Sequence, residues 1–155
     1  MANKPHPLQA AVQVAQSRED EAVKLLAESQ QRLAEQQNRL QQLLSFRGEY
    51  AAQFQDEGGG GISARRFQDY AAFLNSLDQG IVQSRQQLER LRQEVARRRR
   101  DWVQSHAKTK ALEEVMARDQ QVRRRREDQR EQRDSDERNL RGPGGRQRSS
   151  DEEGA

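Results

Sequence analysis

The sequence predicts an all-α protein, a long antiparallel hairpin of two helices that pack as a coiled coil. Of the 155 residues, 32% are hydrophobic and 34% are charged, which is too little apolar surface for a compact core but enough for a narrow seam. Apolar residues recur about every 3.5 residues along two long segments, the spacing typical of coiled coils. A glycine run, Gly58–Gly61, separates these segments and supplies the turn of a hairpin.

The first helix is predicted over residues 7–55, after a flexible N-terminus of residues 1–6. Pro7 suits the first turn of a helix, because the N–H that it lacks would have no partner there. From there to Phe54 the chain has no proline and a single glycine, Gly48. The predicted seam positions are Val12, Glu19, Leu26, Leu33, Leu40, Arg47 and Phe54 in one set, and Leu8, Ala15, Ala22, Ser29, Gln36, Leu43 and Tyr50 in the other.

The second helix is predicted over residues 63–122, after a glycine loop of residues 56–62. Ser63 is a suitable N-cap, and Gly80 is the one glycine inside the helix. Its predicted seam positions are Phe67, Leu74, Ile81, Leu88, Val95, Trp102, Thr109 and Met116 in one set, and Tyr70, Leu77, Ser84, Leu91, Arg98, Ser105 and Leu112 in the other.

The chain beyond Met116 has almost no apolar residues. We predict a charged helical extension over residues 123–141 that frays, because a helix without tertiary packing is marginal in water. The sequence Gly142-Pro143-Gly144-Gly145 should end this helix, and a disordered tail is predicted over residues 142–155.

The register of the two helices is predicted from pairs of seam residues. Folding back at the glycine loop can place Leu26 against Leu91 and, at the same time, Glu19 against Arg98. A slide of one heptad would leave Arg98 facing Leu26, and a buried charge that loses its partner costs about 3–5 kcal/mol. The sequence therefore predicts the first register, with Glu19 and Arg98 fixing it.

Residues that carry catalysis are scarce. The chain has no cysteine, and its two histidines, His6 and His106, lie far apart in the sequence. Neither a metal-ligand spacing nor a nucleophile motif is present, and the glycine loop lacks the features of a phosphate loop. We expect no enzyme activity, no metal and no cofactor. Without a signal-like segment or an apolar membrane span, a cytoplasmic protein is expected.

Two arginine runs, 97–100 and 123–126, leave two interpretations open. Basic clusters can bind phosphates of nucleic acids or anionic lipids. However, four consecutive residues of a helix point in all directions around it, and acidic residues flank both runs. A solvated or protein-binding surface is favoured, and no nucleic acid is expected as a partner.

The aromatic residues gather at the loop end of the hairpin. Phe54, Phe67, Tyr70 and Tyr50 occupy seam positions, where packing explains them. The other two occupy positions outside the seam. Exposed aromatic rings on a polar surface can anchor a partner; additional packing around the turn is the alternative. These two are Phe46 and Phe73.

The stretch from Gly60 to Leu77, Gly-Gly-Ile-Ser-Ala-Arg-Arg-Phe-Gln-Asp-Tyr-Ala-Ala-Phe-Leu-Asn-Ser-Leu, resembles the FliJ family of flagellar type III export proteins. Leu43, Phe46, Glu49 and Tyr50 before the loop, and Trp102 followed by a long charged helix, are similar to that family as well. Much of the similarity, from about Leu8 to Met116, is generic coiled coil; the loop and its aromatic flanks are the specific part.

The resemblance implies a cytoplasmic, non-enzymatic coiled coil similar to the central stalk of rotary ATPases, peripheral to the cell membrane when assembled. It implies binding to the hexameric export ATPase and its regulator, and to the cytoplasmic domain of a membrane export-gate protein. Activation of export or recycling of substrate chaperones would be its role. The chain is expected to be a monomer on its own.

The resemblance also implies which residues meet each partner. At Phe46, Gly80 and Ser84 the chain departs from the family pattern, and Arg39 is a possible further member of the gate surface. The ATPase ring would receive the terminal end, Ala11–Arg18 and Trp102–Leu112, including Ala15, Arg18, Trp102 and Lys108. The gate would bind Leu43, Phe46, Tyr50, Phe73 and Leu77.

Other functions remain open from the sequence. A general export chaperone would hold unfolded flagellar substrates. A basic coiled coil would bind nucleic acid or membrane surfaces through its arginine runs. A self-associating structural coiled coil is a third alternative.

Overall fold

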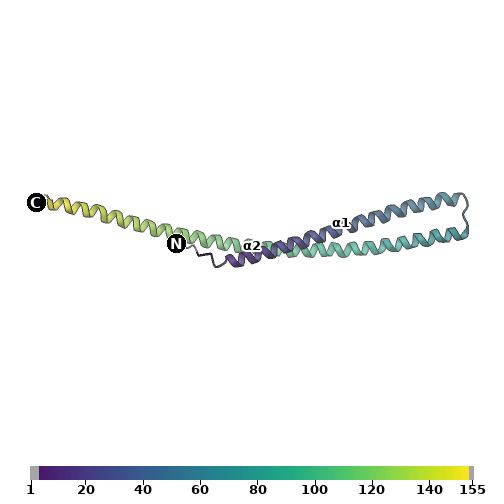
Figure 1. The fold of residues 1–155 in the computed structure, drawn as a ribbon, viewed down its shortest axis with the longest axis horizontal. Coiled ribbons are helices and arrows are strands. Elements are labelled where there is room, and N and C mark those ends of the chain that lie inside the picture. Colours follow the sequence, from purple (N-terminus) through teal and green to yellow (C-terminus); the bar gives the residue numbers. More distant parts are fainter. Residues whose placement is uncertain (1–3, 154–155) are drawn as a thin grey trace. The chain divides into compact units, whose positions relative to one another are not determined.

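The computed structural model of the chain describes residues 4–153, and the side chains of residues 4–141. Over residues 4–153 it contains two α-helices and no strand: α1 (Gln9–Gly59) and α2 (Ala64–Glu153). The two helices run antiparallel from a short turn (Figure 1). The predicted all-α hairpin is therefore confirmed.

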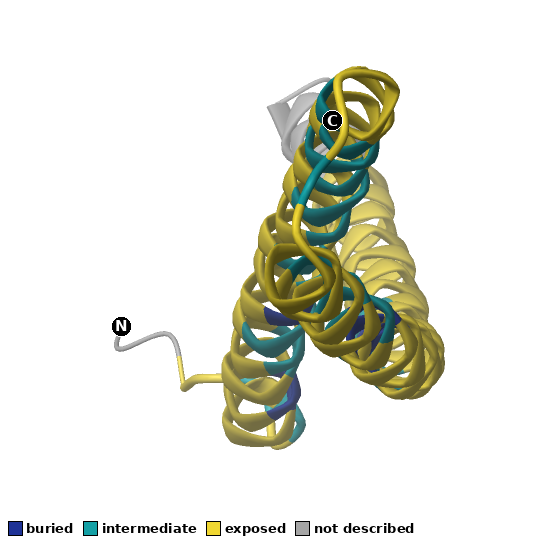
Figure 2. Cartoon of the chain, turned by 90° about the vertical axis from the view of Figure 1, so that its right-hand side faces the viewer, coloured by how far each residue is buried: buried dark blue, intermediate teal, exposed yellow. Residues whose placement is uncertain are grey.

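The chain forms two compact units, which we describe separately. Residues Val14–Lys108, here called the hairpin unit, contain most of α1, the glycine turn and the first half of α2. Met1–Gln13 and Thr109–Ala155 form the terminal unit. Most positions on both helices are exposed, and buried residues occupy only short segments of them (Figure 2).

The buried residues follow the predicted heptads. In the hairpin unit Ser29 and Ser84 are buried as well, and the Ser29 hydroxyl donates to the carbonyl oxygen of Leu26 at 2.8 Å, so the seam contains polar groups that are satisfied locally. In the terminal unit the buried residues include Val12 and Thr109. The apolar core of the hairpin unit comprises Ala15, Ile81, Leu88, Leu91 and Val95.

The turn between the helices is tighter than the sequence suggests. Helix α1 continues to Gly59 instead of ending at Gln55, and the N–H of Gly60 donates to the carbonyl of Glu57 at 3.1 Å. Gly61 follows with φ of +79°, the left-handed conformation that commonly ends a helix and that favours glycine. Ser63 caps α2 as predicted, because its Oγ accepts the N–H of Arg66 at 3.2 Å.

In the terminal unit, a histidine caps the start of α1. His6 Nδ1 accepts the backbone N–H of Leu8 at 3.0 Å, and the His6 carbonyl accepts the N–H of Gln9 at 2.9 Å. The other ring nitrogen, Nε2, lies 3.3 Å from Asp119 Oδ2 of α2. His6 thus joins the N-terminal segment to α2.

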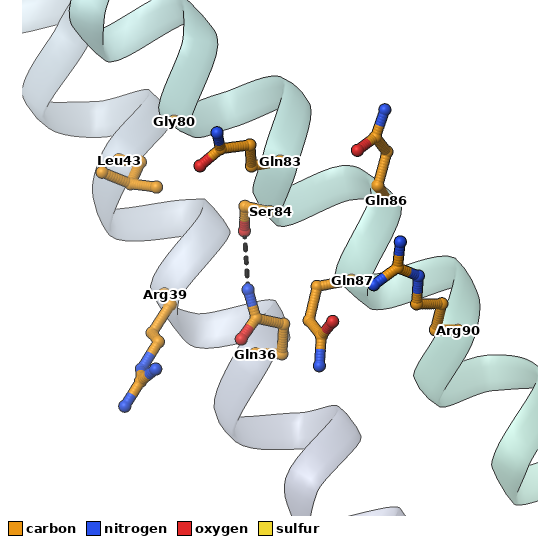
Figure 3. Close-up of a pocket in the computed structure, with 9 residues that line it drawn as sticks. All are labelled: Gln36, Arg39, Leu43, Gly80, Gln83, Ser84, Gln86, Gln87 and Arg90. Carbon is orange, nitrogen blue, oxygen red and sulfur yellow. Dashed lines mark hydrogen bonds between the residues drawn. The ribbon is translucent and has the colours of Figure 1, made fainter.

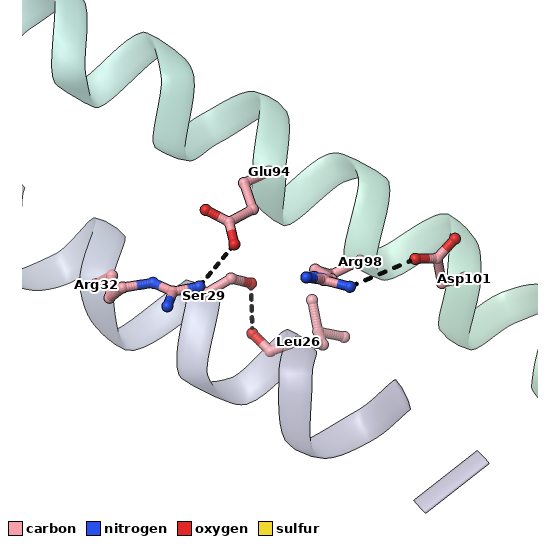
Figure 4. Close-up of polar contacts among 6 residues, drawn as sticks. All are labelled: Leu26, Ser29, Arg32, Glu94, Arg98 and Asp101. Atoms are coloured by element: carbon pink, nitrogen blue, oxygen red, sulfur yellow. Dashed lines mark hydrogen bonds and ion pairs between the residues drawn. The ribbon is translucent and has the colours of Figure 1, made fainter. Parts of the chain in front are cut away.

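The register of the helices differs from the predicted one. Arg32 Nη2 donates to Glu94 Oε1 at 2.6 Å, and Gln36 Nε2 donates to Ser84 Oγ at 2.8 Å. Arg98 lies beside Leu26 (Figure 4). These contacts correspond to a slide of about one heptad from the predicted register, which is the arrangement that the sequence argument rejected.

The predicted pairing of Glu19 with Arg98 is therefore wrong. Glu19 Oε1 lies 2.6 Å from His106 Nδ1, so its charge has a different partner across the seam. Arg98 Nη1 lies 4.0 Å from Asp101 on its own helix, and its side chain keeps 29% of its surface exposed. Glu19 does not require Arg98 because His106 is its partner, and Arg98 tolerates the loss of Glu19 because part of its side chain stays exposed.

The C-terminal part of α2 extends further than the sequence suggests. The helix continues past Gly142 and Pro143 to Glu153, where the sequence predicts an end, and nothing in the described residues explains why it does so. Side chains from residue 142 on, and the last two residues altogether, lie outside the described part of the chain. The disorder expected over residues 142–155 stays a prediction.

Candidate partner-binding surfaces

The phenylalanines and tyrosines of the chain form one continuous series of ring contacts near the turn, here called the aromatic ladder. Four of its cross-helix centroid distances lie between 4.5 and 5.2 Å, and Phe46 meets Phe73 edge to face at 6.1 Å. Offset and edge-to-face pairs at these distances are favourable. Its members are Phe46, Tyr50, Phe54, Phe67, Tyr70 and Phe73.

Three rings of the ladder are largely exposed. Phe46 and Phe73 keep 48% and 40% of their surface exposed, as expected for positions outside the seam. Phe67 was predicted to be a seam residue, but it is 52% exposed. Phe67 lies in the first turn of α2 and its ring contacts Phe54 of α1 at 5.2 Å, so it faces the other helix as predicted but is not buried there.

A polar groove of about 440 Å³ lies next to the ladder along the helices (Figure 3). Two small residues of α2 leave room for the groove. Gly80 has open space where a Cβ would stand, and Ser84 accepts a hydrogen bond from Gln36. The groove is lined by Gln36, Arg39, Leu43, Gly80, Gln83, Ser84, Gln86, Gln87 and Arg90.

The groove and the ladder together contain much of the predicted gate surface. Leu43 lines the groove, and Phe46, Tyr50 and Phe73 belong to the ladder. The fifth residue, Leu77, is half-buried between the helices. The glutamines at 83, 86 and 87 and Arg90 were not anticipated, because only the actual register brings them opposite Arg39 and Gln36.

Polar contacts tie the two helices together around the ladder. The Arg47 guanidinium donates to both carboxylate oxygens of Asp78, and this contact lowers the pKa of Asp78 below its ordinary value of 3.8. The Tyr70 hydroxyl donates to Glu57 Oε2 at 2.7 Å, and Arg66 lies 3.3 Å from the same oxygen. The hydrogen bond to Glu57 raises the pKa of Tyr70 above 10.0.

The Tyr70–Glu57 hydrogen bond predicts a pH dependence. Because the pKa of Tyr70 is raised on folding, the contact stabilises the protein fully below pH 10.0 and is lost as the pH rises through the folded pKa. Glu57→Gln should move this pKa back toward 10.0. Tyrosinate absorbance, titrated in a Tyr50→Phe background that leaves Tyr70 as the one tyrosine, measures it. An unchanged titration in Glu57→Gln would contradict the contact.

The four residues predicted to meet the ATPase at the terminal end of the hairpin unit differ in how far they are exposed. Arg18 and Lys108 are exposed and available to a partner. Ala15 is buried in the seam, so the expectation that it touches a partner is corrected: its small size serves packing between the helices. Trp102 is half-buried and stacks on His106 at 5.2 Å, so it supports the Glu19–His106 contact.

The charged part of α2 in the terminal unit is exposed from Ala117 to Arg141. Its apolar residues Val122 and Leu140 are exposed with it. Within the described residues no group of acidic or histidine side chains is placed to hold a metal ion. No helix in the same part of the chain has the length and apolarity that a membrane span requires.

Comparison with known proteins identifies the family. The FliJ family, described as "Flagellar FliJ protein", matches residues 3–148. A flagellar FliJ protein of Salmonella typhi is 26% identical over 105 residues, which cover 68% of this chain and 71% of that protein. Its Escherichia coli K12 counterpart is 25% identical over 105 residues, with the same coverage. The chain therefore belongs to the FliJ family and is a component of the flagellar protein export apparatus.

Proposed function

We propose that this chain connects the export ATPase ring to the cytoplasmic domain of the membrane export gate, without catalysing a reaction itself. In this role it acts in the cytoplasm, at the inner face of the cell membrane when assembled. It helps to couple ATP hydrolysis, or the activation of export, to secretion. Release and recycling of substrate chaperones would follow from the same contacts.

The observation that carries the proposal is the exposure of Phe46 and Phe73 beside a polar groove. Exposed apolar patches on a polar surface mark interaction sites, and aromatic residues, Phe among them, are enriched in protein interfaces. The groove next to them offers carboxamides and arginines, which can hydrogen-bond a partner around an apolar centre. This part of the hairpin unit is assigned to the gate.

The ATPase is assigned to the other end of the hairpin unit. Arg18 on α1 and Lys108 on α2 are both exposed there and both positive. Exposed charges contribute chiefly to the rate and salt dependence of association. Binding to the ATPase should therefore weaken as salt rises, while binding to the gate through the rings should depend less on salt.

A bridging experiment tests the proposal. The immobilised gate domain should retain the export ATPase when this chain is present, and should retain much less when it is absent. Phe46→Ala with Phe73→Ala should abolish retention of both the chain and the ATPase. If the chain binds an unfolded flagellar substrate but neither of these proteins, the proposal fails and an export chaperone replaces it.

A further inference from the structure

The seam of the hairpin unit can align its helices in more than one way. Its buried residues Ile81, Leu88 and Val95 are each seven positions apart, so a slide of seven residues exchanges one apolar layer for another. After such a slide Leu26 would face Leu91, and Glu19 would face Arg98. The periodic part of the sequence therefore permits two registers.

The register in the structure leaves one side chain poorly satisfied. Arg98 lies against the aliphatic Leu26, as Figure 4 shows, and its guanidinium reaches Asp101 only at 4.0 Å. The Arg98 Nε atom is buried and makes no hydrogen bond to any of residues 4–141. In the other register Glu19 would be its partner across the seam. Arg98 thus favours the register that the structure does not adopt.

Other contacts favour the present register. Glu19 meets His106 at 2.6 Å, Arg32 meets Glu94 at 2.6 Å, and the aromatic ladder joins α1 to α2 near the turn. One side chain of each ion pair, Arg32 or His106, is substantially exposed, whereas Glu94 and Glu19 are mostly covered. Exposed ion pairs contribute modestly. Arg47–Asp78 and Gln36–Ser84 also belong to the present register, so the Glu19–His106 contact is one of several that set the balance between the registers.

The turn can supply the slack that a slide needs. One heptad moves α1 by about 10 Å along α2, at about 1.5 Å per residue. The last turn of α1 contains Gly58 and Gly59, and glycine is a poor helix former, so this turn can unwind at little cost. Unwinding it returns the end of α1 to about Gln55.

We propose that the hairpin unit is a two-register device in which Glu19 exchanges His106 for Arg98. The slide would separate Tyr50 from Phe73 and so rearrange the aromatic ladder at the other end of the same unit. A partner that binds one register more tightly shifts the population toward it, and the change reaches the far end of the helix pair. This inference concerns the chain by itself and does not depend on the identity of its partners.

Disulfide trapping can distinguish the registers, since the chain has no cysteine of its own. The Arg32–Glu94 and Gln36–Ser84 contacts bracket Leu33 and place it opposite Leu91 in the present register. The slide would place Leu33 opposite Ser84. A disulfide requires Cα atoms within about 7 Å, less than the slide of about 10 Å. Leu33→Cys with Leu91→Cys thus reports the present register, and Leu33→Cys with Ser84→Cys reports the slid one.

Substitutions at His106 and Arg98, the two alternative partners of Glu19, should change how often each register is trapped. His106→Ala removes the present partner of Glu19 and should raise the rate at which the Leu33→Cys, Ser84→Cys pair forms its disulfide by roughly tenfold. Arg98→Leu removes the partner offered by the slid register and should lower that rate by a similar factor. Leu33→Cys with Arg85→Cys, an exposed position beside Ser84, reports general opening of the helix pair and should not change. His106→Gln replaces His106→Ala if the latter loses helicity.

Two results would overturn the proposal. One is the absence of a disulfide in the Leu33→Cys, Ser84→Cys pair in all backgrounds, while the Leu33→Cys, Leu91→Cys pair forms one readily. The other is an equal change for the Arg85→Cys control pair, because the trapping would then report opening and not a slide.

Discussion

Phe73→Ala is expected to weaken binding of the chain to the cytoplasmic domain of the export gate by at least about tenfold. Truncating a central aromatic anchor commonly costs about 2 kcal/mol or more, which exceeds the roughly 1.4 kcal/mol of a tenfold change. Phe73 is 40% exposed and contacts both Phe46 and Tyr50, so it can contribute a ring to a partner while α2 stays folded. Calorimetric titration of the gate domain measures the loss.

Phe67→Ala is the matched control for this change. Phe67 lies on the same helix and in the same ladder and is 52% exposed, but its ring contact is with Phe54, away from the groove. Its truncation should change the affinity by less than about threefold, in the range of peripheral contacts. If Phe73→Ala instead abolishes helicity by circular dichroism, Phe73 is a packing residue and the gate surface is misplaced.

Leu88→Ala is expected to lower the free energy of unfolding by about 2–5 kcal/mol, the range for a buried leucine that leaves a cavity. Leu88 is 4% exposed and lies in the middle of the seam of the hairpin unit. A narrow seam has few apolar residues, so the loss of one is a large part of the stability. Urea denaturation followed by circular dichroism measures the change.

Leu140→Ala makes the same chemical change at an exposed position of α2. Leu140 is 77% exposed, and its truncation should alter the free energy of unfolding by no more than about 0.5 kcal/mol. Equal effects of the two substitutions would show that stability does not come from the paired seam.

The features that sequence reasoning predicted are those set by local chemistry. The heptads, a break in the glycine run and the Ser63 cap each depend on neighbouring residues, and the structure contains them, although the break begins only after Gly59. The exposure of Phe46 and Phe73 was predictable for the same reason, since their place in the heptad keeps them out of the seam. Composition and periodicity are enough for such features.

The register could not be predicted in this way. Heptads repeat, so apolar layers alone do not distinguish alignments that differ by seven residues, and the decision falls to polar contacts. Glu19 had two possible partners across the seam, Arg98 and His106, and the contribution of a histidine contact is not visible in a heptad pattern. The groove depends on the register, so the glutamines that line it could not be assigned either.

The central claim, that the chain connects the ATPase ring to the gate, is tested most directly by ATP hydrolysis of the cognate export ATPase titrated with this chain, combined with co-sedimentation of the ring and the gate domain. We expect stimulation of hydrolysis and co-sedimentation of all three proteins at near-stoichiometric ratios. Arg18→Glu with Lys108→Glu should remove both effects while gate binding persists. An unchanged rate, with an assembled ring that sediments without this chain, would contradict the claim.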